Sequence, residues 1–238
     1  MTIQLRIILI IVFITAASCN RARDVQISKQ YVKTNPPKFL DAYWRHLNTA
    51  NDCKVELRHN FVFATKYEPE DECYLEMKSG ELVGIDHGEF GGELKYIADD
   101  HSKKEMTIKR GNIRFIFRYK NNIYFLEGLA HLGSSYGKLS RLDTTNENFH
   151  CVEILNFGDA PGAMAVYKNR LLIVADSNFY EIKEMKKEVL LNDMFWNGLY
   201  PNSIIVIDEK NVFVGIRGGI VKVNMRDKEY EFYRCTVN

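Results

Sequence analysis

The stretch that decides the fold is KNNIYFL, residues 120–126, in which a polar turn signal leads directly into four apolar, β-forming residues. Asn tolerates the positive φ angles of tight hairpins, so the stretch predicts a hairpin turn followed by a buried strand. Related patterns are KSGELVGI, KNRLLIV and DEKNVFVG, at residues 78–85, 168–174 and 208–215. The apolar segments begin at positions 82, 123, 171 and 212, so their separations are 41, 48 and 41 residues.

Each repeat predicts four short strands. One strand precedes the turn, a second follows it, a loop with Gly, Asp or Asn leads to a third, and a more variable fourth strand closes the unit. The expected strands are 74–77, 82–85, 93–97 and 106–108; 113–119, 123–126, 138–142 and 151–155; 163–167, 171–174, 179–183 and 189–191; and 203–207, 212–215, 220–224 and 230–233.

Four antiparallel strands that recur every 40 to 50 residues are typical of β-propeller blades. The sequence therefore predicts an all-β fold, a small β-propeller-like domain over residues 38–238 with four to five blades. Residues 53–68 either supply a fifth blade or complete the last one, and a β-sandwich with even strand spacing is the alternative architecture. Apolar residues near helical spacing predict one short amphipathic helix over residues 38–50.

The N-terminus predicts export from the cytosol. Arg6 precedes an uncharged, mostly apolar run of 11 residues, 7–17, which is shorter than the roughly 20 residues of a membrane-spanning helix. We therefore expect a signal peptide over residues 1–18. The residues AASC, 16–19, resemble the lipobox of bacterial lipoproteins, although Ala16 stands where Leu is commonest.

The lipobox resemblance implies that Cys19 becomes the lipid-carrying first residue of the mature chain. Residues 19–37 then form a polar, lipidated tether, and the protein is anchored in the bacterial cell envelope, in the periplasm or at the outer membrane. The alternative is ordinary cleavage near Ser18, with Cys19 as a plain thiol.

Five cysteines are an odd number for an exported chain, and acylation of Cys19 would leave four. An oxidising compartment would allow disulfides among these four, whereas the alternative is four buried thiols. The remaining cysteines are Cys53, Cys73, Cys151 and Cys235.

The formal net charge is +1, from 32 basic and 31 acidic residues, so nothing in the composition directs the chain to nucleic acid. The sequence contains none of the familiar catalytic motifs, such as a nucleophile elbow or a Walker loop. The glycine-rich segment 88–92 does not open a helix, so we interpret it as a wide hairpin loop rather than a phosphate site. We expect no cofactor and no resident metal.

Candidate binding residues come from loops that equivalent blades would bring to one face. Asp86, His87 and Glu89 are possible metal ligands close together, and the alternative is a rim of hydrogen-bonded polar residues. An aromatic loop, residues 195–201, offers anchors for a partner, although such rings also plug the core between blades. The candidate face consists of His87, Glu89, His131, Asp176, Trp196, Tyr200 and Arg217.

The segments 81–92, 128–132 and 200–204 resemble a loose group of uncharacterised bacterial propeller-like envelope proteins. This resemblance covers most of residues 73–235. It implies a fold and carries over no activity or catalytic residue.

The sequence favours a non-catalytic binding protein of the cell envelope whose partner is a protein or a small ligand. One specific form is an immunity protein that neutralises an envelope-targeted toxin. The alternative is a secreted hydrolase or lyase that acts on a sugar or peptide in a propeller funnel. Its candidate acid and base groups are His87, Glu89 and His131.

Overall fold

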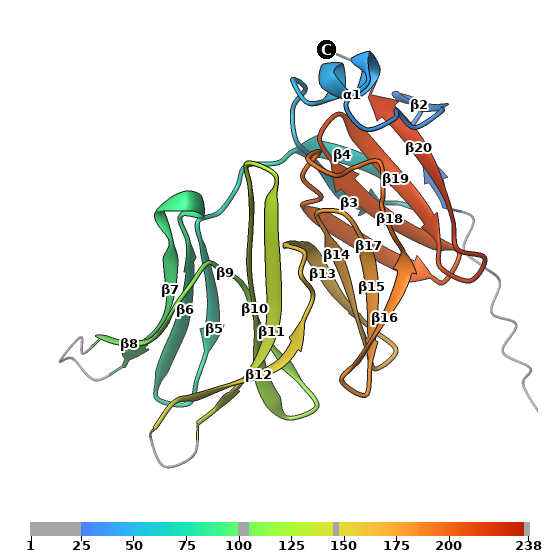
Figure 1. Ribbon diagram of the computed structural model, residues 1–238. Helices are drawn as coiled ribbons and strands as arrows, with labels where there is room; N and C mark the ends of the chain where they lie inside the picture. Colours follow the sequence, from blue (N-terminus) through green and yellow to red (C-terminus); the bar gives the residue numbers. More distant parts are fainter. Residues whose placement is uncertain (1–24, 100–104, 145–147, 236–238) are drawn as a thin grey trace, which may run out of the picture.

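Twenty strands in five separate sheets form nearly all the regular structure of residues 25–99, 105–144 and 148–235, which the computed structural model describes (Figure 1). The expected signal peptide, Cys19 and the start of the expected tether lie outside the described residues. We number the sheets I to V in the chain order of their main strands. The all-β class predicted from the sequence is confirmed.

Sheets II, III, IV and V each contain one of the four predicted repeats, with the four strands in sequence order and antiparallel. Sheet II contains β5 Glu72–Glu76, β6 Gly80–Asp86, β7 Gly92–Ala98 and β8 Glu105–Arg110. Sheet III contains β9 Ile113–Tyr119, β10 Asn122–His131, β11 Ser134–Asp143 and β12 His150–Asn156. Sheet IV contains β13 Pro161–Tyr167, β14 Arg170–Ala175, β15 Phe179–Lys183 and β16 Lys186–Leu191. Sheet V contains β17 Ser203–Asp208, β18 Asn211–Ile216, β19 Gly219–Asn224 and β20 Glu229–Cys235, with β2 Tyr31–Thr34 added at its edge.

Sheet I is a separate sheet, and it does not complete the last one. It contains the antiparallel hairpin β3 Cys53–Arg58 and β4 Phe61–Lys66, with the short β1 Gln26–Ile27 parallel to β4. Its hairpin has the same turn chemistry as the repeats: His59 and Asn60 both have positive φ, as do Lys120 and Asn121 between β9 and β10. Two consecutive positive φ values are the requirement of a tight type I′ hairpin, which Asn meets at low cost.

The second strand of each four-stranded repeat is nearly continuously buried, which explains the apolar runs that mark the repeats. Strands β14 and β18 bury every residue after the first. A strand covered on both faces reads as an unbroken apolar run rather than an alternating pattern. Neighbouring sheets supply that cover: β9 packs on β5 and β6, β13 packs on β10 and β17, and β3 packs on β17 and β18.

Four apolar clusters fill the contacts between consecutive sheets. Leu82 and Phe125 belong to the cluster between sheets II and III. Leu139 and Leu171 belong to the cluster between sheets III and IV. Trp196 lies in the largest cluster, between sheets IV and V, and Phe213 and Val62 belong to the cluster between sheets V and I. The order II–III–IV–V–I therefore follows from packing, and sheet I joins sheet II through the linker 67–71.

The close contact between sheets V and I depends on glycine. A Cβ at Gly215 in β18 would lie 2.1 Å from the carbonyl oxygen of Cys53. Such a distance is far inside van der Waals contact, so only glycine lets β3 approach β18 this closely.

The segment expected to be a polar tether is paired into the body from Gln26 onward. Residues 26–27 extend sheet I, and residues 31–34 pair with β20. Tyr31 is buried, and its hydroxyl donates to the carbonyl of Ala64 and accepts from the Ala64 amide. This segment thus pairs with edge strands of sheets I and V, because unpaired backbone groups at a sheet edge readily pair with an extended strand.

The expected helix is present but shorter than predicted. Helix α1 spans Ala42–Leu47, with Asp41 as its N-cap, accepting from the Trp44 amide at 2.7 Å. The chain before it cannot be helical because Leu40 has a φ of 64°. Trp44 and Leu47 are the buried residues of this helix and pack into the cluster between sheets IV and V.

Candidate functional site

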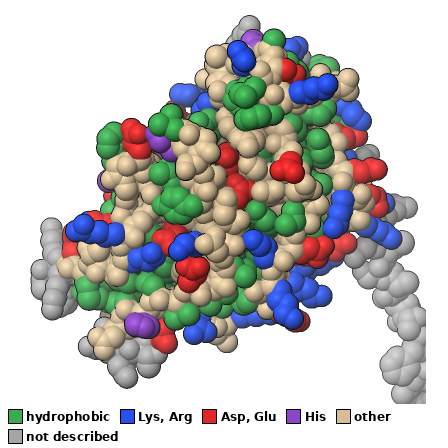
Figure 2. All heavy atoms as spheres, viewed as in Figure 1, with side chains coloured by type: hydrophobic (Ala, Val, Ile, Leu, Met, Phe, Trp, Pro, Cys, Tyr) green, Lys and Arg blue, Asp and Glu red, His purple; other side chains and the backbone are tan. Residues whose placement is uncertain are grey.

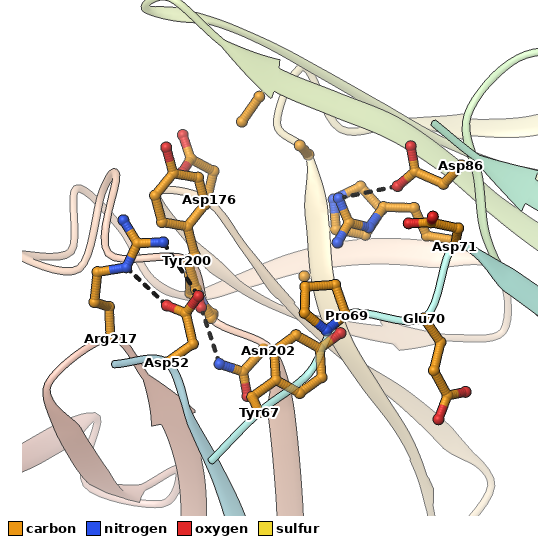
Figure 3. A pocket seen from close by; sticks show the side chains of 16 residues that line it. Asp52, Tyr67, Pro69, Glu70, Asp71, Asp86, Asp176, Tyr200, Asn202 and Arg217 are labelled. Carbon is orange, nitrogen blue, oxygen red and sulfur yellow. Dashed lines mark hydrogen bonds and ion pairs between the residues drawn. The ribbon is translucent and has the colours of Figure 1, made fainter. Parts of the chain in front are cut away.

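A pocket of about 240 Å³ lies where residues from all five sheets and their adjoining loops meet (Figure 3). The lining residues of each sheet lie just before or at the start of its first main strand, near the end of its second strand, or at both places. The lining side chains are Asp52, Tyr67, Pro69, Glu70, Asp71, Asp86, Arg114, Ala130, Ala160, Pro161, Asp176, Tyr200, Pro201, Asn202 and Arg217, and Gly162 adds backbone.

A repeated backbone hydrogen bond explains why these positions converge. In four of the sheets, an amide at or near the end of the second strand donates to the carbonyl of the residue just before the first strand. The pairs are Tyr67–Asp52 at 2.8 Å, Asp86–Asp71 at 2.8 Å, Gly128–Asn112 at 3.0 Å and Asp176–Ala160 at 2.9 Å. Equivalent positions of the repeat therefore deliver their side chains to the same end of each sheet.

The pocket is acidic. Five carboxyl groups line it, against two guanidinium groups, which gives a formal charge of −3. Within the described residues, Glu70 and Asp71 form no ion pair. Figure 3 shows them on the Asp86 side of the pocket, opposite Asp52 and Arg217.

Arg217 is held by three separate contacts. Its Nε and Nη2 donate to the two carboxylate oxygens of Asp52 at 2.8 and 3.1 Å. Its Nη1 donates to Asn48 Oδ1 at 3.0 Å, and its guanidinium lies 4.4 Å from the ring centre of Tyr200. A two-point contact of this kind fixes orientation as well as charge, so Arg217 ties sheet V to sheet I and to the end of α1.

Asp86 is fixed from the opposite side of the pocket. One of its oxygens accepts from the buried Asn112 side chain at 2.7 Å and from the Gly88 amide at 3.0 Å. Its other oxygen lies 3.4 Å from Arg114 Nη1. Both arginines of the pocket are thus engaged by aspartates, and the uncompensated negative charge rests on the other carboxyl groups.

Asp176 is a partly buried carboxyl group of the pocket with a raised pKa. Burial raises its pKa, the buried Asp159 nearby raises it further, and a hydrogen bond from the Gly198 amide at 3.2 Å opposes both. Burial also raises the pKa of Tyr67, with Arg114 opposing the effect of the neighbouring carboxylates. Desolvation disfavours the charged form of an acid, so these shifts show that the pocket is partly shielded from water.

Three residues of the predicted binding face line the pocket: Asp176, Tyr200 and Arg217. Glu89 and His131 do not line it, but the structure brings them together on its rim, with His131 Nε2 3.0 Å from Glu89 Oε2. His87 is exposed next to the 3₁₀ helix η1, Gly88–Phe90, and does not join this pair.

The prediction that Trp196 belongs to the binding face is wrong. Its side chain is fully buried, and its Nε1 donates to the carbonyl of Ala175 at 3.1 Å. The apolar ring fills the space between sheets IV and V, where burial stabilises the fold. The aromatic residues of the loop 195–201 therefore lie in two environments: Trp196 lies in the core, and Tyr200 lines the pocket.

The structure contains no disulfide among the four described cysteines, which lie on four different strands. Burial raises the pKa of the Cys53 and Cys73 thiols to about 11. Burial also raises the pKa of the Cys151 thiol. A buried thiol with a raised pKa behaves as a small apolar side chain.

Sequence reasoning missed Asp52, Asp71 and Arg114 as pocket residues. The sequence feature that could have indicated pocket residues is the position immediately before the first strand of each unit. Asp52, Asp71 and Asn202 occupy this position. That signal needs the fold, because only the convergence of the sheets turns equivalent positions into one site.

Comparison with known proteins gives no relative: no protein-family model matches the chain, and no curated protein matches it. Among the residues that the structure describes, no three His, Cys, Asp or Glu side chains are grouped to hold a metal ion. Over the same part of the chain, none of the helices has the length and apolar character required to cross a bilayer.

Proposed function

We propose that the five sheets are the blades of a small β-propeller, and that its pocket face is a non-catalytic binding site for a cationic side chain of a partner protein. The observation that carries this proposal is the convergence of five carboxyl groups on one pocket lined from all five sheets. A pocket at the common end of radially arranged sheets is the usual place for recognition in this architecture.

The size of the pocket supports a side chain rather than a whole ligand. At about 240 Å³ it is smaller than the roughly 300–1,000 Å³ of pockets that hold drug-sized molecules. One lysine or arginine side chain with a few waters is a reasonable occupant. The remainder of the partner would then contact the rim.

The charge of the pocket supports a cation. Asp71 and Glu70 carry no ion pair within the described residues, and Figure 3 shows Asp71 next to the already paired Asp86. An entering guanidinium or ammonium group would relieve the repulsion between these carboxylates. An entering anion would meet a formal charge of −3.

We further propose that the protein is exported and anchored in the bacterial envelope by lipid on Cys19, which fits an immunity protein that caps an envelope-targeted toxin. The support is the sequence of the first nineteen residues, which lie outside the described part of the chain. Radioactive palmitate should label the wild-type protein in bacteria and spare Cys19→Ala. Equal labelling of both would remove the anchor from the proposal.

The test of the binding site is a calorimetric titration of the purified protein with N-acetyl-argininamide and with its neutral analogue N-acetyl-citrullinamide. We expect the arginine compound to bind and the citrulline compound to bind at least tenfold more weakly. Asp71→Asn should weaken arginine binding about fivefold, because it removes an unpaired carboxylate from the pocket.

The matched control is Glu229→Gln, which makes the same change of charge at the far end of sheet V. Glu229 begins β20 and does not line the pocket. Its affinity for N-acetyl-argininamide should equal that of the wild type. Equal effects of the two substitutions, or equal binding of the two compounds, would contradict a cation pocket.

A second candidate function is hydrolysis of a sugar or peptide, and the raised pKa of Asp176 is the observation that favours it. Burial that raises the pKa of one carboxyl group beside other carboxyl groups is the arrangement found for general acids. The rim pair Glu89–His131 lies outside the pocket lining, so Asp176 replaces these residues as the candidate acid. Turnover of a panel of chromogenic glycosides and peptides, lost in Asp176→Asn, would favour this function.

A further inference from the structure

Two large apolar side chains are exposed beside the pocket. Phe90 is 86% exposed and Leu132 is 92% exposed, the two highest values among the large apolar residues that the structure describes as exposed. Phe90 belongs to η1, and Leu132 lies at the tip of the β10–β11 hairpin. Figure 2 shows apolar side chains with a histidine and an acidic group over this end of sheets II and III.

These two tips are joined by a contact between their neighbours in sequence, Glu89 and His131. The distance of 3.0 Å between His131 Nε2 and Glu89 Oε2 brings the two loops together, and η1 also contacts β10. Phe90 and Leu132 therefore stand on two adjoining loop tips, and we call this pair of exposed side chains the apolar knob.

The loop that carries Phe90 is held in place by hydrogen bonds from Asn112. The buried side chain of Asn112 donates to the carbonyl oxygens of Gly88 and Gly91 at 2.6 and 3.1 Å, as well as to Asp86. The loop that carries Phe90 is thus held by the same side chain that holds a pocket carboxylate. A surface that is already ordered before binding loses little conformational entropy when a partner docks.

The two tips of the knob are close in sequence to residues that line the acidic pocket. Ala130 lines the pocket and is separated from Leu132 by one residue, and Asp86 lines it four residues before Phe90. Exposed apolar groups at the edge of a charged recess are characteristic of a protein interface.

We propose that Phe90 and Leu132 are the apolar part of a composite docking surface, which takes a protein segment presenting a lysine or arginine to the pocket and apolar residues next to it to the knob. This inference rests on the proposed function and adds the identity of the partner segment. The formal charge of −3 in the adjoining pocket argues for a basic protein segment and against an anionic bilayer.

The experiment compares two synthetic peptides, acetyl-Leu-Arg-Phe-amide and acetyl-Ser-Arg-Ser-amide, in calorimetric titrations of the full protein. We expect the apolar-flanked peptide to bind about tenfold more tightly. The double substitution Phe90→Ser with Leu132→Asn should abolish that advantage and leave the affinity for acetyl-Ser-Arg-Ser-amide unchanged. Asn suits position 132, where φ is 49°, so the variant retains the loop geometry.

The control is Val166→Ser, which removes an exposed apolar side chain near the end of β13 that is distant from the pocket. It should keep the tenfold advantage of the apolar-flanked peptide. An unchanged melting temperature of the double variant confirms its fold, and each single substitution gives the same comparison should the double variant unfold.

The outcomes separate the two proposals. If acetyl-Ser-Arg-Ser-amide fails to bind, the cation pocket is wrong. If both peptides bind equally, the pocket stands and the docking surface is wrong. If phosphatidylcholine–phosphatidylglycerol vesicles bind the wild type and the double substitution abolishes this, the knob serves a membrane and the protein-docking proposal is overturned.

Discussion

Replacing Arg217 by methionine tests whether the contacts around the pocket also hold sheets V and I together. Methionine retains about the length of the aliphatic part of the side chain and removes the guanidinium group with its charge and its hydrogen bonds. The wild-type guanidinium binds both oxygens of Asp52, donates to Asn48 and lies on the Tyr200 ring. The substitution therefore breaks three contacts between different parts of the chain.

The expected loss of stability follows from these contacts. The side chains of Arg217 and Asp52 are 24% and 21% exposed, so their two-point ion pair is partly screened and contributes about 1–2 kcal/mol. The cation–ring contact adds roughly 0.5–1 kcal/mol, and the hydrogen bond to Asn48 adds about 1 kcal/mol. We expect Arg217→Met to lose about 3 kcal/mol, which for a chain of this size lowers the melting temperature by roughly 6–12 °C.

The assay is urea denaturation followed by fluorescence, with Lys138→Met as the control. Among the described residues, Lys138 has a single ion-pair partner, Glu153, at 2.7 Å, and the two side chains are 35% and 49% exposed. Removal of such a surface pair should cost less than about 1 kcal/mol. Equal losses for Arg217→Met and Lys138→Met would refute the view that Arg217 joins the two sheets.

Three further predictions follow from buried groups. Burial raises the folded-state pKa of Asp176 above 3.8, so the folded protein holds this proton more tightly than the unfolded chain and loses stability as pH rises through that window. The unfolding free energy of Asp176→Asn, measured relative to wild type, should therefore increase as pH rises from about 3.8; a difference that is constant with pH would contradict this. The thiols of Cys53 and Cys73, with pKa values of about 11, should resist iodoacetamide at about pH 8 until urea unfolds the chain; mass spectrometry that finds equal labelling in the folded protein would show that they are accessible. Trp196→Phe removes part of a fully buried ring and leaves the Ala175 carbonyl without its donor, so it should lose about 2–3 kcal/mol in urea denaturation, and a loss below about 1 kcal/mol would be inconsistent with this packing.

Much of the strand order could be predicted because two local signals agree. A turn such as Lys168–Asn169 requires positive φ at both residues, and the following β14 is buried on both faces. Both requirements appear directly in the sequence, as Asn in the turn and as an unbroken apolar run after it. Wherever the two signals coincide, the structure contains the expected hairpin.

The N-terminal segment was harder to predict, because its strands depend on distant partners. The strands at residues 26–27 and 31–34 are very short, and they form only by pairing with the edges that β4 and β20 provide. Tyr31 is the one residue there whose burial could have been suspected. Strand formation at an edge is set by tertiary pairing more than by local propensity.

The candidate site could be predicted only in part, for a related reason. Asp176 and Arg217 were found because they occupy loops after second strands, where equivalent repeats converge, and Tyr200 was found because an aromatic residue in a loop can anchor a partner. Trp196 was misplaced because an aromatic loop residue and an aromatic core residue look alike in sequence. The choice between them depends on packing between sheets, which a linear pattern does not contain.

A crystal structure of the protein with bound N-acetyl-argininamide tests the central claim most directly. The proposal predicts the guanidinium group inside the pocket, within hydrogen-bond distance of Asp71 or Asp176, with the rest of the compound directed toward the rim that carries Phe90 and Leu132. A compound bound at another surface, with the pocket carboxylates still paired only as in the unbound protein, would contradict it.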